Sequence, residues 1–319
     1  MNVAPVNIIR ETMNAVELSG LRKSFGDFVA VHDISLTVPR GTIYGFLGPN
    51  GAGKTTTIRM MMSIFYPDSG SISILGEPNS ESIKDRLGYL PEEKGLYKNM
   101  TSIDLIAYFG RLKGLSKKEA RERAAALMTK YGLGEWTDTK TKALSKGMGQ
   151  KVQILATLIH DPELVILDEP FSGLDPVNVE VVRSAILEMK RAGKTVIFST
   201  HVMEQAEQIC DSVVLINRGR VVLDGRISDV RTSGGRTVHL DYEGDGTFLS
   251  SLRGIERVND AGKHAEFVLK EGTDADDLLK QLVGRVKIRS FDTREASLHE
   301  VFVRAVGNDG GTTRGGAHA

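Results

Sequence analysis

The sequence predicts an α/β domain with a mainly parallel sheet, followed by a small α+β domain. Residues 16–226 alternate short β-branched runs with longer segments of helical periodicity, the pattern of a parallel α/β sheet. A glycine-rich loop lies inside that pattern, between an apolar strand and a helix. After Arg226 short strands and helices follow one another in a different order. With 319 residues and 40% hydrophobic content, the chain can build two cores.

Four short apolar runs in the first domain are predicted to be buried strands. They are residues 42–47, 164–167, 195–199 and 213–216. Two apolar stripes at helical spacing predict core faces of helices. They are Ile58, Met61, Met62 and Phe65, and Val152, Leu155, Ala156 and Ile159. Residues 113–131, rich in Ala, Lys, Arg and Glu, predict a surface helix of an inserted helical subdomain.

The C-terminal part predicts six elements and a closing helix. They are strand 237–242, helix 247–252, strands 255–258 and 265–269, helix 275–283 and strand 286–290. This βαββαβ order predicts a ferredoxin-like domain. Ser297 with Glu300 predicts a capping box at the start of a helix over 297–305. We therefore expect a tail at 1–15, a first domain at 16–228, an accessory domain at 229–306 beginning near a linker at 226–230, and a disordered Gly-rich tail at 307–319.

The bulk composition excludes several function classes. Basic and acidic residues number 41 each, so no overall positive field attracts nucleic acid, and we expect no nucleic-acid partner. The single cysteine, Cys210, excludes an intramolecular disulfide and a cysteine metal cage, which fits a reducing compartment. The chain has neither a signal peptide nor an apolar run near the ~20 residues that span a bilayer. We expect a cytosolic chain that is soluble on its own.

The glycine-rich loop has the pattern of a phosphate-binding loop (P-loop). Its residues are Gly48, Pro49, Asn50, Gly51, Ala52, Gly53, Lys54, Thr55 and Thr56. The glycines let backbone N–H groups surround phosphate at a helix N-terminus. Lys54 then neutralises the β and γ phosphates of ATP, and the Thr55 hydroxyl coordinates Mg²⁺. A Gly-rich turn without a ligand is the alternative, and the strand–loop–helix context disfavours it.

Two adjacent carboxylates end the buried strand 164–167. Asp168 is predicted to hold Mg²⁺, usually through water, at the carboxyl end of the strand beside the loop. Glu169 is predicted to polarise the water that attacks the γ phosphate, as a general base. The alternative for both residues is a pair of ordinary surface acids.

Three further motifs occur in an order that identifies a family. Residues 144–149 contain Ser145 and Gly147 before a helix, residues 171–176 contain Asp175, and His201 follows the strand 195–199. With the two motifs above, they resemble the signature, D-loop and switch histidine of ATP-binding cassette proteins, over about two thirds of the chain. The resemblance implies a P-loop NTPase cassette with an inserted helical subdomain.

The resemblance also implies how the site is assembled. Two cassettes of this family dimerise head to tail, so each ATP lies between the phosphate loop of one chain and Ser145 and Gly147 of the other. Hydrolysis removes the bridging γ phosphate and opens the dimer. Of the remaining motif residues, His201 and Asp175 are implied to act with Glu169 in catalysis, and Phe25 to stack on adenine.

The chain departs from the family pattern at three places. Phe25 stands where Tyr is common, and Lys146 and Met148 occupy signature positions that are often Gly and Gln. Glu92 takes the place of the Q-loop glutamine. Its carboxylate is predicted to face ATP and to coordinate Mg²⁺ or water, and the alternative is an exposed loop acid.

Residues 89–97 and the small C-terminal domain resemble bacterial exporter cassettes, which include sodium-extrusion and drug-efflux systems. This resemblance implies an ATP hydrolase on the cytoplasmic face of the membrane, attached to a separate polytopic permease. The permease would dock near Glu92 and the helical subdomain. A soluble cassette acting on ribosomes, DNA or a scaffold, and a nucleotide-gated regulator with little turnover, are the alternatives.

Overall fold

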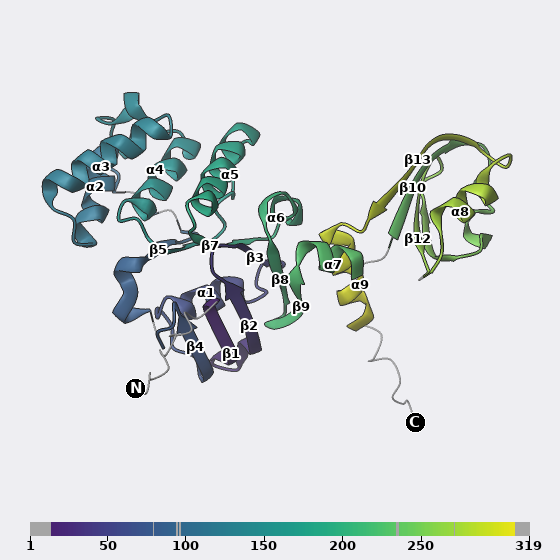
Figure 1. Cartoon of the computed structure of the whole chain (residues 1–319), viewed down its shortest axis with the longest axis horizontal. Helices are drawn as coiled ribbons and strands as arrows, with labels where there is room; N and C mark the ends of the chain where they lie inside the picture. The colour runs from purple at the N-terminus through teal and green to yellow at the C-terminus, as the bar shows by residue number, and fades with distance from the viewer. Residues whose placement is uncertain are drawn as a thin grey trace, which may run out of the picture. The chain divides into compact units, whose positions relative to one another are not determined.

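The computed structural model describes residues 14–78, 80–93, 95, 97–233, 236–270 and 272–309. The predicted tails fall outside this description apart from their residues nearest the domains. The chain divides into two compact units, residues 1–224 and 225–319. Each is described by itself below, with elements labelled as in Figure 1.

The first unit is built on a six-stranded sheet in the order β5-β6-β7-β3-β8-β9. The strands are β3 (Ile43–Leu47), β5 (Leu87–Leu90), β6 (Leu164–Leu167), β7 (Thr195–Thr200), β8 (Ser212–Asn217) and β9 (Arg220–Arg226). From β5 to β8 all neighbours pair in parallel. The four predicted strands are therefore confirmed. Because strands β3, β6 and β7 are adjacent and parallel, their carboxyl ends meet at one edge of the sheet.

An antiparallel sheet that the sequence analysis did not predict packs beside this one. It consists of β1 (Asn14–Phe25), β2 (Phe28–Pro39) and β4 (Ser69–Ile74), in the order β2-β1-β4. Its apolar residues share one core with β3 and with helix α1 (Lys54–Met61). Of the predicted stripe, Ile58 and Met61 are buried in this core, and Met62 and Phe65 pack against it.

A helical layer contains α2 (Ser102–Leu112), α3 (Lys117–Lys130) and α4 (Lys146–Leu158). The predicted single helix over 113–131 is wrong at its start. Gly114 adopts φ 90°, which ends α2, and the Ser116 side chain caps a new helix by accepting a hydrogen bond from Glu119 N. The predicted stripe on α4 packs on α2 and α3. The short helices η2 (Gly134–Trp136) and η3 (Thr141–Ala143) lead into α4.

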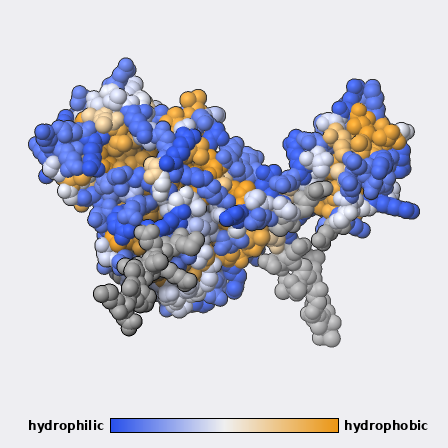
Figure 2. Space-filling model, viewed as in Figure 1, coloured by the Kyte–Doolittle hydropathy of each residue, from blue (hydrophilic) through white to orange (hydrophobic). Residues whose placement is uncertain are grey.

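The remaining helices of the first unit connect its strands. Helix η1 (Glu81–Arg86) precedes β5, α5 (Pro176–Arg191) connects β6 to β7, and α6 (Met203–Ile209) connects β7 to β8. In Figure 2, hydrophobic surface appears among the helices α2, α3 and α4. No helix within the described residues is long and apolar enough to span a membrane.

The second unit confirms the ferredoxin-like prediction. Strands β10 (Arg236–Glu243), β11 (Ile255–Asp260), β12 (His264–Leu269) and β13 (Lys287–Glu295) form an antiparallel sheet in the order β11-β12-β10-β13. Helix α8 (Ala275–Leu282) contributes Leu278 and Leu282 to its core. The predicted helix over 247–252 is only a 3₁₀ turn, η4 (Leu249–Ser251). The run between Gly246 and Gly254 is so short that its hydrogen bonds cannot offset the free-energy cost of helix nucleation.

One helix precedes this sheet in the chain and another follows it. The first of them corrects the predicted linker. The expected linker at 226–230 is largely helical, since α7 (Ile227–Ser233) begins directly after β9 and packs against α9 (Leu298–Asp309). The predicted capping box of α9 is confirmed. Glu300 N donates to Ser297 Oγ at 3.2 Å, and Ser297 N donates to Glu300 Oε2 at 2.5 Å.

Candidate nucleotide site

The phosphate loop connects β3 to α1 and has a backbone that needs glycine. All five residues of β3 are buried, and the chain then turns through Gly48 and Gly53, at φ 146° and 104°. A Cβ at Gly48 would lie 2.1 Å from the Ile216 carbonyl oxygen, and one at Gly53 would lie 2.6 Å from the Ala30 carbonyl oxygen. No larger residue fits either position, so the glycines bring the loop close against β2 and β8.

Lys54, the first residue of α1, is almost fully buried at 5% exposure. Its Nζ donates to the Gly48 carbonyl at 2.7 Å and the Pro49 carbonyl at 3.2 Å, and lies 3.7 Å from Glu169 Oε1. Burial lowers the pKa of Lys54, and the nearby carboxylates, Glu169 first, oppose that shift. The amine is therefore held inside the loop, facing acidic groups.

Asp168 lies at the carboxyl end of β6, beside α1. Its Oδ1 accepts hydrogen bonds from Ser199 Oγ at 2.5 Å and from Thr55 Oγ1 at 3.3 Å. Its Oδ2 is buried and has no hydrogen-bond partner among the described residues. A buried carboxylate oxygen beside a threonine hydroxyl is a suitable set of oxygen donors for Mg²⁺.

Glu169 has a strained backbone and a fixed neighbour. Its φ of 48° is rare for a residue with a side chain, and its N–H donates to Ser199 Oγ at 2.9 Å. The carboxylate, at 8% exposure, lies 3.1 and 3.2 Å from His201 Nδ1. The structure thus brings Lys54, Asp168, Glu169 and His201 into one network of contacts, in part through Ser199.

A cavity of about 420 Å³ opens above the loop. The predicted residues that line it are Asn50, Gly51, Ala52, Gly53, Lys54, Thr55, Thr56, Glu92 and Glu169. Glu92 therefore faces the same cavity as Lys54, and its charge acts on the Lys54 amine. The cavity combines a curved loop of backbone amides, one buried amine and two carboxylates, an arrangement that suits a polyphosphate carried with a divalent cation.

Phe25 does not line this cavity, whereas Phe28 does. The two residues pair across the β1–β2 hairpin. Phe25 makes an edge contact with Phe65 at 5.4 Å between ring centres and is 45% exposed, whereas Phe28 is 64% exposed. Phe28 is not among the predicted site residues, although the Gly26–Asp27 turn between two β-branched runs could have indicated a hairpin with an aromatic on each strand.

Ser145, Gly147 and Asp175 lie outside the cavity and form a second cluster. Ser145 caps α4 by accepting a hydrogen bond from Met148 N at 3.2 Å, and Asp175 caps α5 by accepting one from Asn178 N at 3.0 Å. A Cβ at Gly147 would lie 2.3 Å from the Asn178 side chain, so Gly147 lets the two helix ends approach. Ser145 itself is exposed.

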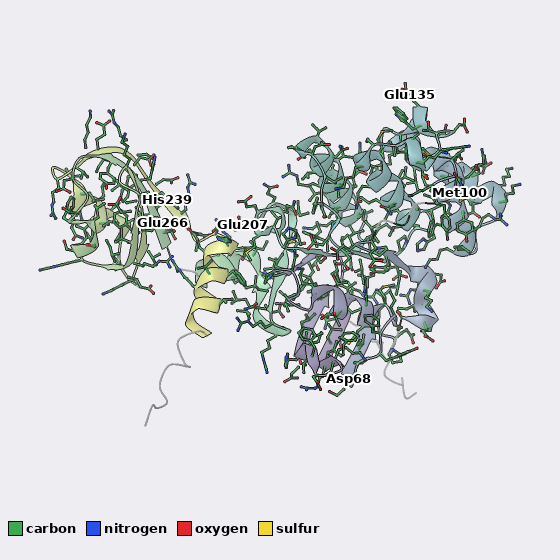
Figure 3. All side chains as sticks on the ribbon, turned by 180° about the vertical axis from the view of Figure 1, so that it is seen from behind. Asp68, Met100, Glu135, Glu207, His239 and Glu266 are labelled. Atoms are coloured by element: carbon green, nitrogen blue, oxygen red, sulfur yellow. The ribbon has the colours of Figure 1, made fainter. Side chains whose placement is uncertain are left out.

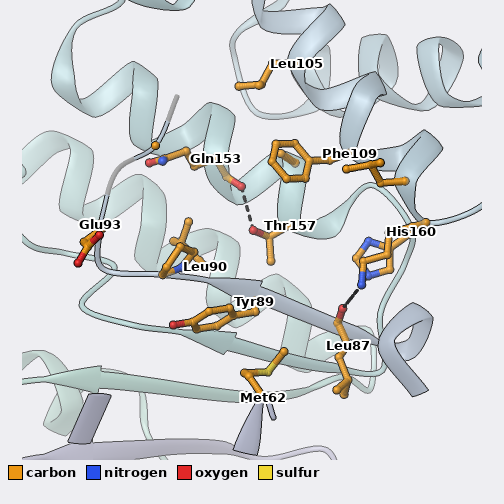
Figure 4. A pocket seen from close by; sticks show the side chains of 15 residues that line it. Met62, Leu87, Tyr89, Leu90, Glu93, Leu105, Phe109, Gln153, Thr157 and His160 are labelled. Carbon is orange, nitrogen blue, oxygen red and sulfur yellow. Dashed lines mark hydrogen bonds between the residues drawn. The ribbon is translucent and has the colours of Figure 1, made fainter. Parts of the chain in front are cut away.

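A mainly apolar cavity of about 380 Å³ lies between β5 and the helices α2 and α4 (Figure 4). Tyr89, Leu90, Leu105 and Phe109 line it together with polar groups. Among these, His160 Nε2 lies 2.9 Å from the Leu87 carbonyl oxygen, and burial lowers the pKa of His160.

Comparison with known proteins identifies the family. Residues 31–172 match the ABC transporter family model, and residues 225–306 match the C-terminal domain of ATP-binding proteins like DrrA1-3. An uncharacterised ABC transporter ATP-binding protein of Bacillus subtilis, YhaQ, is 38% identical over 288 residues, covering 89% of this chain and 96% of that protein. The chain belongs to the ATP-binding subunits of ABC transporters. It is an ATP hydrolase whose activity is coupled to transport.

Two further similarities extend this identification. The Nod factor export ATP-binding protein I of Sinorhizobium fredii is 34% identical to this ABC subunit over 303 residues, covering 92% of this chain and 87% of that protein. A solved structure of the ATP-binding subunit of an ABC transporter superposes with a TM-score of 0.63 at 32% identity, covering 69% of this chain and 92% of that one. The predicted family and fold are confirmed.

Proposed function

We propose that this subunit dimerises with a second copy around two ATP·Mg²⁺ and drives export through a separately encoded membrane permease. The observation that carries the proposal is the separation of two sets of motif residues. The phosphate loop, Asp168, Glu169 and His201 belong to one network, whereas Ser145 and Asp175 cap helices outside its cavity.

In this proposal Glu169 is the general base of hydrolysis. Its carboxylate is buried beside Lys54, and His201 lies within hydrogen-bond distance to orient it. Phosphate charge is neutralised by Lys54 and by the Mg²⁺, which Thr55, Asp168 and Glu92 would hold. Asp168 Oδ2, which has no hydrogen-bond partner in the part of the chain that the structure describes, supports this fit.

In the proposed dimer, the second cluster, formed by Ser145, Gly147 and Asp175, binds a ligand. Ser145 and Gly147 stand at the N-terminus of α4, where N–H groups and the helix dipole favour an anion. That anion would be the γ phosphate held on the phosphate loop of the second copy. Asp175 would approach the same interface from α5, and Phe25 with Phe28 would contact the adenine ring on the loop side.

The permease would dock at the apolar cavity between β5, α2 and α4, which is lined by Glu93, the residue that follows Glu92 (Figure 4). This location would place the subunit at the cytoplasmic face of the membrane as a peripheral protein. Export as the direction is supported by the name of the Nod factor export relative.

A substitution at Ser145, made in a chain that cannot hydrolyse ATP, tests the head-to-tail dimer. Ser145→Arg in a Glu169→Gln background should bind ATP as a monomer and fail to dimerise, because the arginine would enter the opposing phosphate site. Light scattering with ATP measures the mass of the complex. Ser116→Arg is the matched control, since Ser116 caps α3 with the same 3.2 Å geometry and should still dimerise. An ATP-dependent dimer of the Ser145→Arg protein would overturn the head-to-tail arrangement.

The permease is tested by affinity purification of the full chain from detergent-solubilised membranes. A polytopic membrane protein should co-purify, and substitution of Phe109 by Asp in the apolar cavity should release it. Recovery of ribosomes or DNA instead would support a soluble cassette acting on those partners.

A further inference from the structure

Ser199 links the two carboxylates of the nucleotide site. It lies on β7, fully buried, and the parallel register that pairs Leu167 with Phe198 brings it beside Asp168. Its Oγ lies 2.5 Å from Asp168 Oδ1 and 2.9 Å from the backbone nitrogen of Glu169. None of the motifs identified in the sequence assigns this serine a role.

The direction of both hydrogen bonds is fixed by chemistry. A backbone N–H can only donate, and an ionised carboxylate can only accept, so Ser199 Oγ accepts from Glu169 and donates its one hydrogen to Asp168. Neither alanine nor valine can make either bond. Threonine carries the same hydroxyl on a branched side chain.

Two consequences follow for the carboxylates. Asp168 Oδ1 is occupied by the Ser199 and Thr55 hydroxyls, so Oδ2, which has no partner among the described residues, is the oxygen left to face a cation. Glu169 stands at φ 48°, and its N–H bond to Ser199 helps to hold that unfavourable conformation. One hydroxyl therefore sets the orientation of Asp168 and the backbone of Glu169 together.

We propose that Ser199 is a positioning residue for ATP hydrolysis, fixing the cation-binding face of Asp168 and the direction of the Glu169 side chain. The inference rests on the proposed roles of these two carboxylates. Ser199 itself is fully buried and does not line the cavity above the phosphate loop. Its loss should therefore reduce turnover and cation affinity and leave nucleotide affinity nearly unchanged.

The test compares Ser199→Ala, Ser199→Thr and Ser199→Val in the full chain. Ser199→Ala should lower kcat by about 10- to 100-fold, the range known for removal of a group that orients a metal ligand. The KM for ATP should change little, since Lys54 and the loop amides are untouched. The Mg²⁺ concentration for half-maximal rate should rise. Because threonine and valine have the same shape, Ser199→Thr should recover rate and Ser199→Val should not.

A second measurement does not depend on turnover. Mn²⁺ binding in the presence of ADP, followed by electron paramagnetic resonance, should weaken in Ser199→Ala and return in Ser199→Thr. Thr195→Val is the matched control, since Thr195 is also a buried β7 residue, whose Oγ1 accepts a hydrogen bond from Gly41 N at the other end of the strand. It should alter melting temperature without altering kcat or Mn²⁺ binding.

The outcomes separate this inference from the proposed function. Asp168→Asn and Glu169→Gln serve as references. If both lose turnover while Ser199→Ala keeps kcat and Mn²⁺ affinity, the positioning role is wrong and the carboxylate roles stand. If Ser199→Val matches Ser199→Thr, the hydroxyl is irrelevant and the role is again overturned. If Asp168→Asn and Glu169→Gln keep full turnover, the proposed roles of the two carboxylates are wrong, and the positioning role of Ser199 is wrong with them.

Discussion

Carboxylates outnumber the amine at the nucleotide site. Asp168 and Glu169 act on Lys54 from the same network, and Glu92 adds a third negative charge from the cavity wall. ATP brings more negative charge, so a divalent cation would reduce the repulsion between its phosphates and these carboxylates. We therefore propose that ATP arrives with Mg²⁺, and that Glu92, in place of a neutral glutamine, strengthens that requirement.

Neutralising Glu169 should separate binding from turnover. Glu169→Gln should lower kcat by roughly 10²- to 10⁴-fold, the usual cost of losing a general base. ATP affinity should stay equal or increase, because a negative charge 3.7 Å from Lys54 is removed. Phosphate release and calorimetry measure the two effects.

Glu135→Gln provides the control for charge alone, since Glu135 is exposed on the helical layer (Figure 3). Glu135→Gln should change neither kcat nor the affinity for ATP. Near-normal hydrolysis by Glu169→Gln would show that another group activates the water.

Single residues were predictable only where a motif fixes their spacing. The loop, Lys54 and the Asp168–Glu169 pair could be located because their chemistry needs neighbours in sequence. Ser199 lies 31 residues from Asp168 and reaches it only through the pairing of β6 with β7. A serine at the end of an apolar strand carries no local signal of such a partner.

Helices and strands were predictable from the sequence where all their residues are buried. Strands β3 and β6 are buried along their whole length and read as continuous apolar runs. Strands β1 and β2 alternate buried and exposed residues and are interrupted by register shifts, so their pattern is weaker. The junction of α2 and α3 was missed because the capping action of Ser116 outweighs a composition that favours one continuous helix.

A carboxyl pair connects the second sheet to α9. Glu266 on β12 lies opposite His239 on β10 (Figure 3), and its side chain hydrogen-bonds to Glu300 on α9. That bond, with partial burial and the Glu300 charge, raises the pKa of Glu266 to about 7. Arg257 and Arg304 oppose this shift. Burial raises the pKa of Glu300, but its hydrogen bonds to Glu266 and Ser297 outweigh burial, so that the pKa of Glu300 is lowered. A proton on Glu266 would therefore favour the contact between the two carboxyl groups.

This pair predicts that the second unit loses stability as pH rises. The Glu266 pKa in the folded chain exceeds the ~4.3 of an unfolded glutamate. Stability from its protonated form is therefore complete below about pH 4.3 and is lost as pH rises through about 7. The lowered pKa of Glu300 acts in the opposite direction only at lower pH. Hydrogen exchange of β12 and α9 amides, corrected for intrinsic rates, should show weaker protection at pH 8 than at pH 5.5.

Glu266→Gln should flatten this dependence, because an amide donates to Glu300 without titrating. Glu256→Gln, at an exposed position of β11, should leave the dependence intact. An unchanged pH profile in Glu266→Gln would show that the pair does not control the stability of this unit.

At the scale of the whole molecule, the second domain was predictable from the change in the order of strands and helices near residue 226. Its first helix, α7, was not predictable, because its sequence pattern is weak. The run from Ile227 to Ser233 is short and polar, and only Ile227 and Val230 in it are buried apolar residues. The α7–α9 packing that stabilises it involves a partner about 70 residues later in the chain.

Removing the second unit should leave nucleotide binding unchanged. A chain ending at Arg226 keeps β9 in the six-stranded sheet and every residue that we assign to the site, the last being His201. The second unit has a core of its own around Leu240, Phe267 and Leu278, so its loss does not remove the central core of the first. Calorimetry should give the same ATP affinity as the full chain, and the melting transition of the fragment should remain cooperative. Full-length Leu278→Asp, which disrupts the second core without shortening the chain, should bind ATP equally well. A fragment that melts cooperatively but no longer binds ATP would show that the second unit completes the nucleotide site, and the domain boundary proposed here would then be wrong.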